Sequence, residues 1–129
     1  MPKQIYINNK ISPYNKIIQV SSDKSLSLRA ILLASQAVGV SKISNLLESE
    51  DVLNALKIIK KLGINYKKRK DFYEIHGFGL NGFNPRNNLT INAGNSGTLG
   101  RLILSLLIKI DKKIRLIGDK SLSKRDFSR

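Results

Sequence analysis

Asn95, Ser96, Gly97 and Arg101 lie where a short apolar strand is predicted to turn into an apolar helix. A glycine at such a turn lets backbone N–H groups approach a ligand closely, and a helix N-terminus favours negative charge. Arg101 follows Gly97 by four residues, so the helical repeat places both on one face of the first turns. These residue types indicate a binding site for a phosphate or a carboxylate.

An earlier segment repeats this arrangement. Ser25 and Arg29 are also four residues apart, after the apolar, strand-like residues 17–20 and at the start of a predicted helix that continues through the apolar residues 30–38. In both segments a polar turn follows the helix, then a strand (42–47 and 113–117), then an acid at a new helical start, Asp51 or Asp119. We interpret the chain as a duplicated α/β unit whose second copy is barely complete.

Other patterns predict the elements between the two segments. Residues 51–62 form an amphipathic helix that ends before Gly63, residues 64–68 and 72–76 form two strands, and residues 77–88 form a loop. After residue 20 the predicted order is therefore helix, strand, helix, strand, strand, strand, helix, strand.

Composition sets broad limits on the function. The 129 residues include no cysteine, which excludes disulfides and thiolate chemistry, and no pattern indicates a metal or a cofactor. Neither a signal peptide nor a membrane-spanning run is visible, so we expect a soluble cytoplasmic protein. The net charge of +14 favours anionic partners, although heavy use of Lys, Ile and Asn along the chain explains it equally well.

Four motifs in order resemble the N-terminal part of the 5-enolpyruvylshikimate-3-phosphate synthase family. They are residues 23–29 (DKSLSLR), 46–52 (LLESEDV), 94–98 (GNSGT) with Arg101, and 118–122 (GDKSL) with Arg125. The resemblance covers essentially the whole chain but only the opening portion of the longer, two-domain family members. It implies repeated βαβαββ units of the inverse α/β barrel type, here incomplete. Residues 1–20 would join the distal domain's sheet, and residues 21–129 would form the first repeat and part of the second.

The family transfers the enolpyruvyl group of phosphoenolpyruvate to the 5-hydroxyl of shikimate 3-phosphate and releases phosphate. The resemblance implies that Ser25 and Arg29 bind shikimate 3-phosphate and that Asp51 supports the network around Lys24, with Arg101 in a supporting role. The residues implied to contact phosphoenolpyruvate are Lys24, Asn95, Gly97 and Arg125. The family's catalytic acid–base groups lie beyond residue 129. The resemblance therefore implies no certain catalytic residue in this chain, which alone should be inactive or nearly so. The complete protein is expected to be a monomer.

Simpler structural roles are open for several of these residues. Asp23 or Ser25 could be only a helix cap, and Asp51 only an acid that suits the first turn of its helix. Arg29 and Arg101 lie inside strongly apolar helices, and a buried arginine needs an anionic partner, which favours the functional role. His76 is expected to be structural or exposed. Gly100 and Asp126 depart from the family, which more usually has a larger apolar residue and a proline there.

Other functions remain open as alternatives. The related UDP-N-acetylglucosamine enolpyruvyl transferases share the fold, but their motifs match less well. A basic nucleic-acid-binding module would use residues 66–73, where cations alternate with aromatic side chains. A hairpin with a solvated charged tip explains that segment better, so nucleic acid is disfavoured as a partner. A degenerate remnant kept for an interaction is a further possibility.

Overall fold

The computed structural model describes residues 4, 6, 8–10, 12–13 and 15–127 of the chain. Their elements follow the order that the sequence predicts. They are α1 (Lys24–Gln36), β1 (Val38–Ser44), α2 (Glu50–Lys61), β2 (Asn65–Lys68), β3 (Phe72–Phe78), β4 (Leu89–Asn92), α3 (Gly97–Leu107), β5 (Ile114–Ile117) and the 3-10 helix η1 (Leu122–Lys124).

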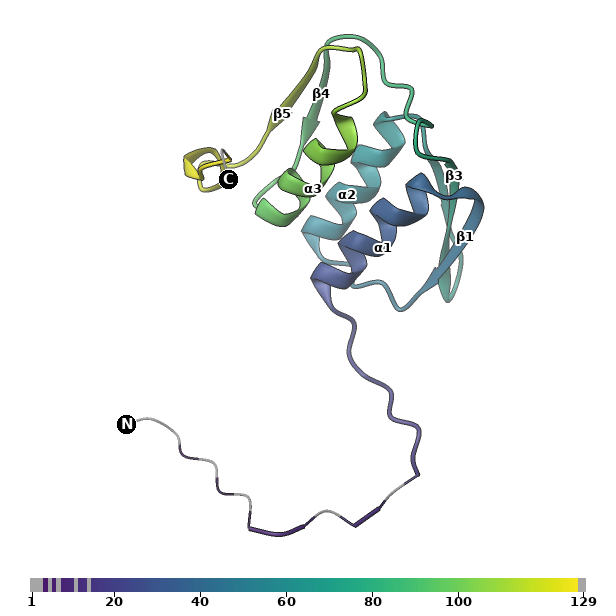
Figure 1. Cartoon of the computed structure of the whole chain (residues 1–129), viewed down its shortest axis with the longest axis vertical. Helices are drawn as coiled ribbons and strands as arrows, with labels where there is room; N and C mark the ends of the chain where they lie inside the picture. The colour runs from purple at the N-terminus through teal and green to yellow at the C-terminus, as the bar shows by residue number, and fades with distance from the viewer. Residues whose placement is uncertain (1–3, 5, 7, 11, 14, 128–129) are drawn as a thin grey trace.

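The helices lie side by side between two small sheets (Figure 1). One sheet has the order β1-β3-β2 and is antiparallel, and the other pairs β4 with β5 in parallel. Because the paired strands of the second sheet run the same way, their carboxyl ends meet at one edge, where Asn92 is opposite Ile117. This edge leads directly into the N-terminus of α3 and into the C-terminal segment.

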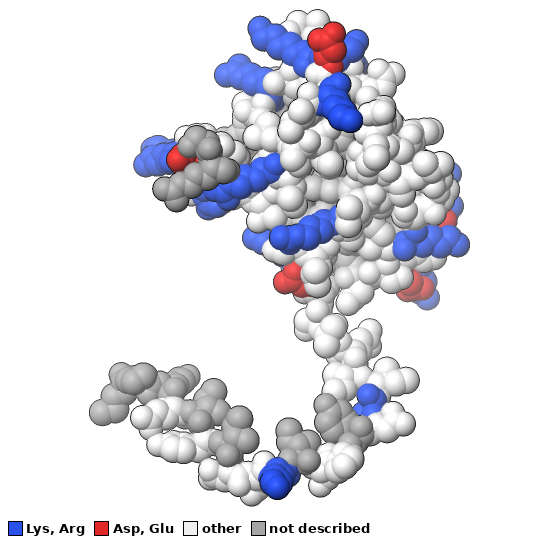
Figure 2. All heavy atoms as spheres, viewed as in Figure 1, with Lys and Arg blue, Asp and Glu red and all other residues white. Residues whose placement is uncertain are grey.

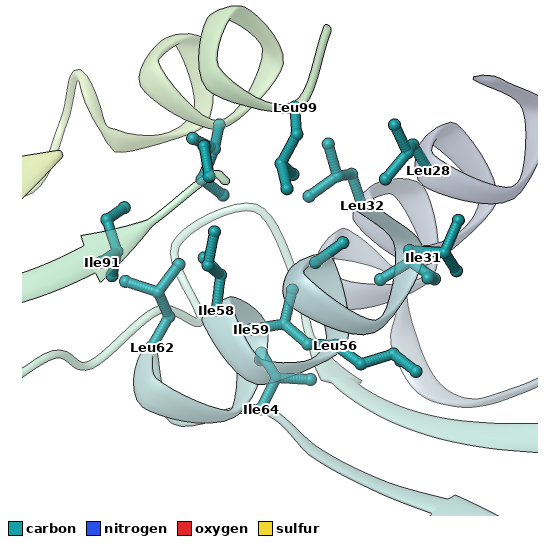
Figure 3. Packing of buried hydrophobic residues seen from close by; sticks show 14 of the residues in the cluster. Leu28, Ile31, Leu32, Leu56, Ile58, Ile59, Leu62, Ile64, Ile91 and Leu99 are labelled. Atoms are coloured by element: carbon teal, nitrogen blue, oxygen red, sulfur yellow. The ribbon is translucent and has the colours of Figure 1, made fainter. Parts of the chain in front are cut away.

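The core joins the helices to both sheets (Figure 3). The apolar stripe predicted for α2 is fully buried, and Gly63 ends that helix in the left-handed conformation with φ +96°, as expected. The largest fully buried side chains come from α1, α2, β3, β4 and α3 and the residues beside them: Leu28, Ile31, Val52, Leu56, Ile58, Ile59, Leu62, Ile64, Ile75, Ile91, Leu99 and Ile103.

Strand β1 is displaced from the predicted position. It begins at Val38 instead of residue 42 and ends at Ser44, because Ala37 ends α1 in an extended conformation and Asn45 turns the chain with φ +56°. Opposite this start, Gly77 leaves room for the carbonyls of Ala34 and Ala37. Consequently β3 continues to Phe78, two residues into the predicted loop, and α1 stops at Gln36 instead of reaching residue 38.

The strand predicted at residues 17–20 belongs to neither sheet of the described chain. Ile17, Ile18 and Val20 are exposed, so the first copy of the proposed repeat lacks the strand that precedes the helix in the second. Of the segment predicted to join a distal domain, residues 1–3, 5, 7, 11 and 14 lie outside the described residues, as do 128–129 at the other end. Its pairing therefore stays a prediction.

Within the described residues, no helix is long and apolar enough to cross a membrane.

Candidate anion-binding site

The first turn of α1 is capped by Asp23. Its Oδ1 accepts a hydrogen bond from the Leu26 N–H at 2.7 Å, and its carbonyl accepts one from the Ser27 hydroxyl at 2.7 Å. This settles the choice between Asp23 and Ser25 as the cap. Ser25, which follows Lys24 in the sequence and is half-buried in the same turn, is therefore not needed for capping.

Lys24 forms an ion pair with the first turn of α2. Its Nζ lies 2.9 Å from Oδ2 of Asp51, whose side chain is only 14% exposed while that of Lys24 is 51% exposed. The structure thus places Asp51 against Lys24, where the sequence predicts it. A well-shielded carboxylate holding a half-exposed lysine fixes the position of the ammonium while leaving part of it open to a ligand.

Arg29 is exposed, which contradicts the expectation that it is buried in an apolar helix. It lies with the exposed side chains of Leu26 and Leu33 on the face of α1 that does not enter the core. Its Nη1 donates to the Ser25 carbonyl at 3.1 Å, so the guanidinium lies against the backbone of the first turn of α1.

The turn before α3 is built from short polar side chains. Oδ1 of Asn92 accepts from the Gly94 N–H at 2.8 Å, Gly94 has φ +59°, and the Ser96 hydroxyl caps the helix by accepting from the Leu99 N–H at 3.2 Å. Asn95 is exposed between them. The N-terminus of α3 is therefore capped by a residue of the turn itself, Ser96.

The C-terminal segment returns to this turn from β5. The Asp119 N–H donates to the Gly94 carbonyl at 2.8 Å, and Oδ1 of Asp119 accepts from the Leu122 N–H at 2.6 Å, which starts η1 at the predicted acid. Arg125 then lies across the start of α3. Its Nη2 donates to Oδ1 of Asn95 at 3.2 Å, and its Nη1 is 2.8 Å from where a Cβ of Gly97 would be.

Arg101 is exposed like Arg29, which corrects the same expectation of burial. Its guanidinium lies 5.5 Å from the ring centre of Phe127, and its Nη2 donates to the Asp126 carbonyl at 3.5 Å. No role for Phe127 was predicted from the sequence. An aromatic ring two residues after a candidate ligand-binding arginine was the only available signal.

A second cluster holds the loop that leads into α2. Glu48 accepts from the Lys68 ammonium at 2.8 Å and from the Tyr73 hydroxyl at 2.8 Å. These hydrogen bonds hold the pKa of the Glu48 carboxyl below its usual range, and the bond from Lys68 has the larger effect. The same bond raises the pKa of Lys68, while burial and then Glu48 raise the pKa of the Tyr73 hydroxyl. Sequence reasoning missed this cluster because its members are far apart in the chain.

His76 is half-buried on β3, and its Nε2 is buried with no hydrogen-bond partner among the described residues. Within those residues, no group of His, Cys, Asp and Glu side chains could hold a metal ion.

The three helices begin at the same end of the molecule (Figure 1). This brings Lys24 and Ser25 of α1, Asp51 of α2, and the Gly97 turn with Arg125 to one end. Figure 2 shows Lys and Arg side chains beside the C-terminal segment and also at the upper end of this face, with fewer Asp and Glu among them. Free N–H groups together with lysine and arginine bind phosphates and carboxylates.

A family model, relatives of known name and solved structures all match this chain to one family. The family model of EPSP synthase (3-phosphoshikimate 1-carboxyvinyltransferase) matches residues 8–129. The 3-phosphoshikimate 1-carboxyvinyltransferase of Streptococcus pyogenes serotype M1 is 39% identical over 127 residues, which are 98% of this chain and 29% of that protein. The one from Streptococcus suis (strain 98HAH33) is 42% identical over 113 residues, which are 87% of this chain and 26% of that protein.

A solved structure supports the same assignment at the level of the fold. The EPSP synthase from Acinetobacter baumannii superposes with a TM-score of 0.69 and 33% identity, over 84% of this chain and 24% of that one. The chain thus spans less than a third of the length of the relatives it matches. With the matched motifs lying at the helix N-termini described above, this chain belongs to the EPSP synthase (3-phosphoshikimate 1-carboxyvinyltransferase) family.

Proposed function

We propose that this chain supplies part of the substrate site of a cytoplasmic 3-phosphoshikimate 1-carboxyvinyltransferase. That enzyme transfers the enolpyruvyl group of phosphoenolpyruvate to the 5-hydroxyl of shikimate 3-phosphate and releases phosphate, a step toward the aromatic amino acids. The observation that carries the proposal is the meeting of two capped helix N-termini with Lys24 and Arg125 at one end of the fold.

The two helix N-termini suit two different anions. Ser25 and Arg29 share the first turns of α1, and we assign shikimate 3-phosphate to them. Asn95, Gly97 and Arg125 form the second group, and we assign phosphoenolpyruvate to it, with Lys24 as a further contact to that substrate. Two multiply charged substrates can lie next to each other only where cations and N–H donors offset their repulsion.

Asp51 and Arg101 act indirectly in this proposal. Asp51 fixes the Lys24 ammonium through the 2.9 Å ion pair, and Arg101 contacts the segment that carries Arg125. The resemblance assigns the family's catalytic acid–base groups to the portion of its members that this chain does not cover. We therefore expect the 129-residue chain alone to bind its ligands weakly and not to turn over.

Activity is tested in a chimera in which this chain replaces the matching N-terminal portion of the Streptococcus pyogenes enzyme. We expect phosphate release from phosphoenolpyruvate with shikimate 3-phosphate and none with UDP-N-acetylglucosamine. Lys24→Met should abolish release, whereas Lys57→Met, which removes an exposed lysine of α2, should not.

A chimera that folds, as judged by its circular dichroism, and uses only the UDP-sugar would contradict the proposal. Should the chimera not fold, NMR titration of the 129-residue chain with shikimate 3-phosphate decides instead. Shifts confined to the N-terminal turns of α1 support the assignment, and shifts spread over the basic surface oppose it.

A further inference from the structure

Gly100 is buried, and an aromatic ring occupies the space beside it. A Cβ at Gly100 would lie 3.1 Å from Cε1 and 3.3 Å from Cζ of Phe127, and 3.8 Å from Cδ2 of Leu116. These distances show that the ring packs directly on the backbone of α3. The absence of a side chain at residue 100 is what lets Phe127 come this close.

Arg101, the next residue of α3, lies over the same ring. The Arg101 guanidinium lies 5.5 Å from the ring centre of Phe127, and its Nη2 reaches the Asp126 carbonyl at 3.5 Å. The segment 125–127 is thus attached to α3 by a ring contact, a cation–π contact and a hydrogen bond.

Two side chains of this segment pack on the two glycines of α3, one on each. Gly97 and Gly100 are three residues apart and so lie on one face of the helix. The Arg125 guanidinium covers Gly97, and the Phe127 ring covers Gly100. On its other side Arg125 is fixed by its own N–H, which donates to the Leu122 carbonyl at 3.0 Å.

We propose that Phe127, packed on Gly100, is a positioning residue that holds Arg125 over the N-terminus of α3 for an incoming phosphate. The proposal rests on the anion-binding role given to Arg125 above. Anchoring the chain two residues after Arg125 limits the positions open to its long side chain before the ligand arrives.

The test measures the 129-residue chain by NMR, without and with phosphoenolpyruvate. In the free chain, the Phe127 ring should shift the Gly100 Hα signals upfield, and the Arg125 Hε signal should be displaced from its random-coil position. Phe127→Ala should remove both effects, and Phe127→Met should restore the Arg125 shift in part. Phe78→Ala removes an exposed ring on β3 and should leave both signals unchanged.

Binding gives the second measurement. We expect Phe127→Ala to weaken phosphoenolpyruvate binding by about 2- to 10-fold, the range for ordering one long side chain. Gly100→Ala should weaken binding similarly, because it displaces the ring without removing it, while the helix itself is not weakened.

The two proposals fail separately. If the wild-type chain does not bind phosphoenolpyruvate but Phe127→Ala still releases the Arg125 signal, the positioning role stands and the proposed function is opposed. An Arg125 signal that Phe127→Ala leaves unchanged, or wild-type binding that it does not weaken, would overturn the positioning role.

Discussion

Gly97 leaves space for Arg125 that a larger residue would fill. As the first residue of α3 it lies under the Arg125 guanidinium, whose Nη1 would be 2.8 Å from an added Cβ. Its φ is not in the left-handed region, so alanine fits its backbone without strain. The glycine is therefore needed for what lies above it and not for the conformation of the chain.

Gly97→Ala should leave the melting temperature equal to or slightly above that of the wild type, because alanine is the better helix former. It should nevertheless weaken phosphoenolpyruvate binding, since the methyl group pushes Arg125 off the helix N-terminus. Calorimetric titration and thermal unfolding measure the two effects separately. A large loss of stability would show that the role of this glycine is in folding.

Lys24 and Asp51 are coupled by the ion pair between α1 and α2. A double-mutant cycle of Lys24→Met and Asp51→Asn should show coupling in ligand binding, because Asp51 acts through the lysine. In unfolding, the coupling should be at most about 1 kcal/mol, as for other partly exposed pairs. Additive effects on binding would show that Asp51 has no part in positioning Lys24.

At the scale of elements, the loop between β1 and α2 is held from two sides. Ser27 of α1 is 5% exposed, and its hydroxyl both donates to the Asp23 carbonyl and accepts from the Leu47 N–H at 3.0 Å. Glu48, the next residue of the loop, is held by the hairpin of β2 and β3. Both contacts fix where α2, and with it Asp51, begins.

Ser27→Ala should destabilise the chain by about 1–3 kcal/mol, because it leaves the Leu47 N–H without its acceptor. Ser105→Ala is the matched control, since that exposed hydroxyl also donates to a carbonyl of its own helix, at 2.7 Å, and its loss should cost less than about 0.5 kcal/mol. Urea unfolding gives both values. Equal effects in the two variants would show that the link to the loop adds nothing.

Glu48 should make the stability of the chain fall at acidic pH. Its pKa is lower in the folded than in the unfolded chain, so its contribution is present above the unfolded pKa of about 4.3 and is lost as the pH falls through the folded value. Glu48→Gln should therefore flatten the loss of melting temperature on acidification below about pH 5. Glu50→Gln, a neighbouring exposed acid, should keep the wild-type profile. Identical profiles for Glu48→Gln and the wild type would contradict this.

The order of the elements was predictable because their apolar periodicities are local. The stripe of α2 and the Gly63 cap were predicted correctly, as was the acid that starts η1. The start of β1 was not, since it depends on pairing with β3 far along the chain. Burial of Arg29 was wrong because α1 is apolar on more than one face, and Leu26 and Leu33 remain exposed.

At the scale of the whole molecule, the net charge of +14 raises the question of whether the surface binds nucleic acid. In the hairpin proposed for nucleic acid, Tyr73 is buried and two of the cations are already paired, Lys68 with Glu48 and Arg69 with Glu74. Bases stack on exposed aromatic faces, so this hairpin offers little of what a single strand requires.

The chain should accordingly show only weak, non-specific binding to a single-stranded oligonucleotide, lost between about 50 and 200 mM salt. A gel shift over that salt range measures this, with Tyr66→Ala as the variant that removes the half-buried ring of the hairpin. Salt-resistant binding that this variant abolishes would favour the nucleic-acid module instead.

The shared direction of the three helices has a consequence before any contact forms. The dipoles of parallel helices add, each contributing about half a positive charge at its N-terminus, so the fold has a polarity as well as a net charge. This field acts on an anion close to the three N-termini, and salt screens it, with a screening length of about 10 Å at 0.1 M. The attraction of an anionic ligand to this end of the fold should therefore weaken as the ionic strength rises.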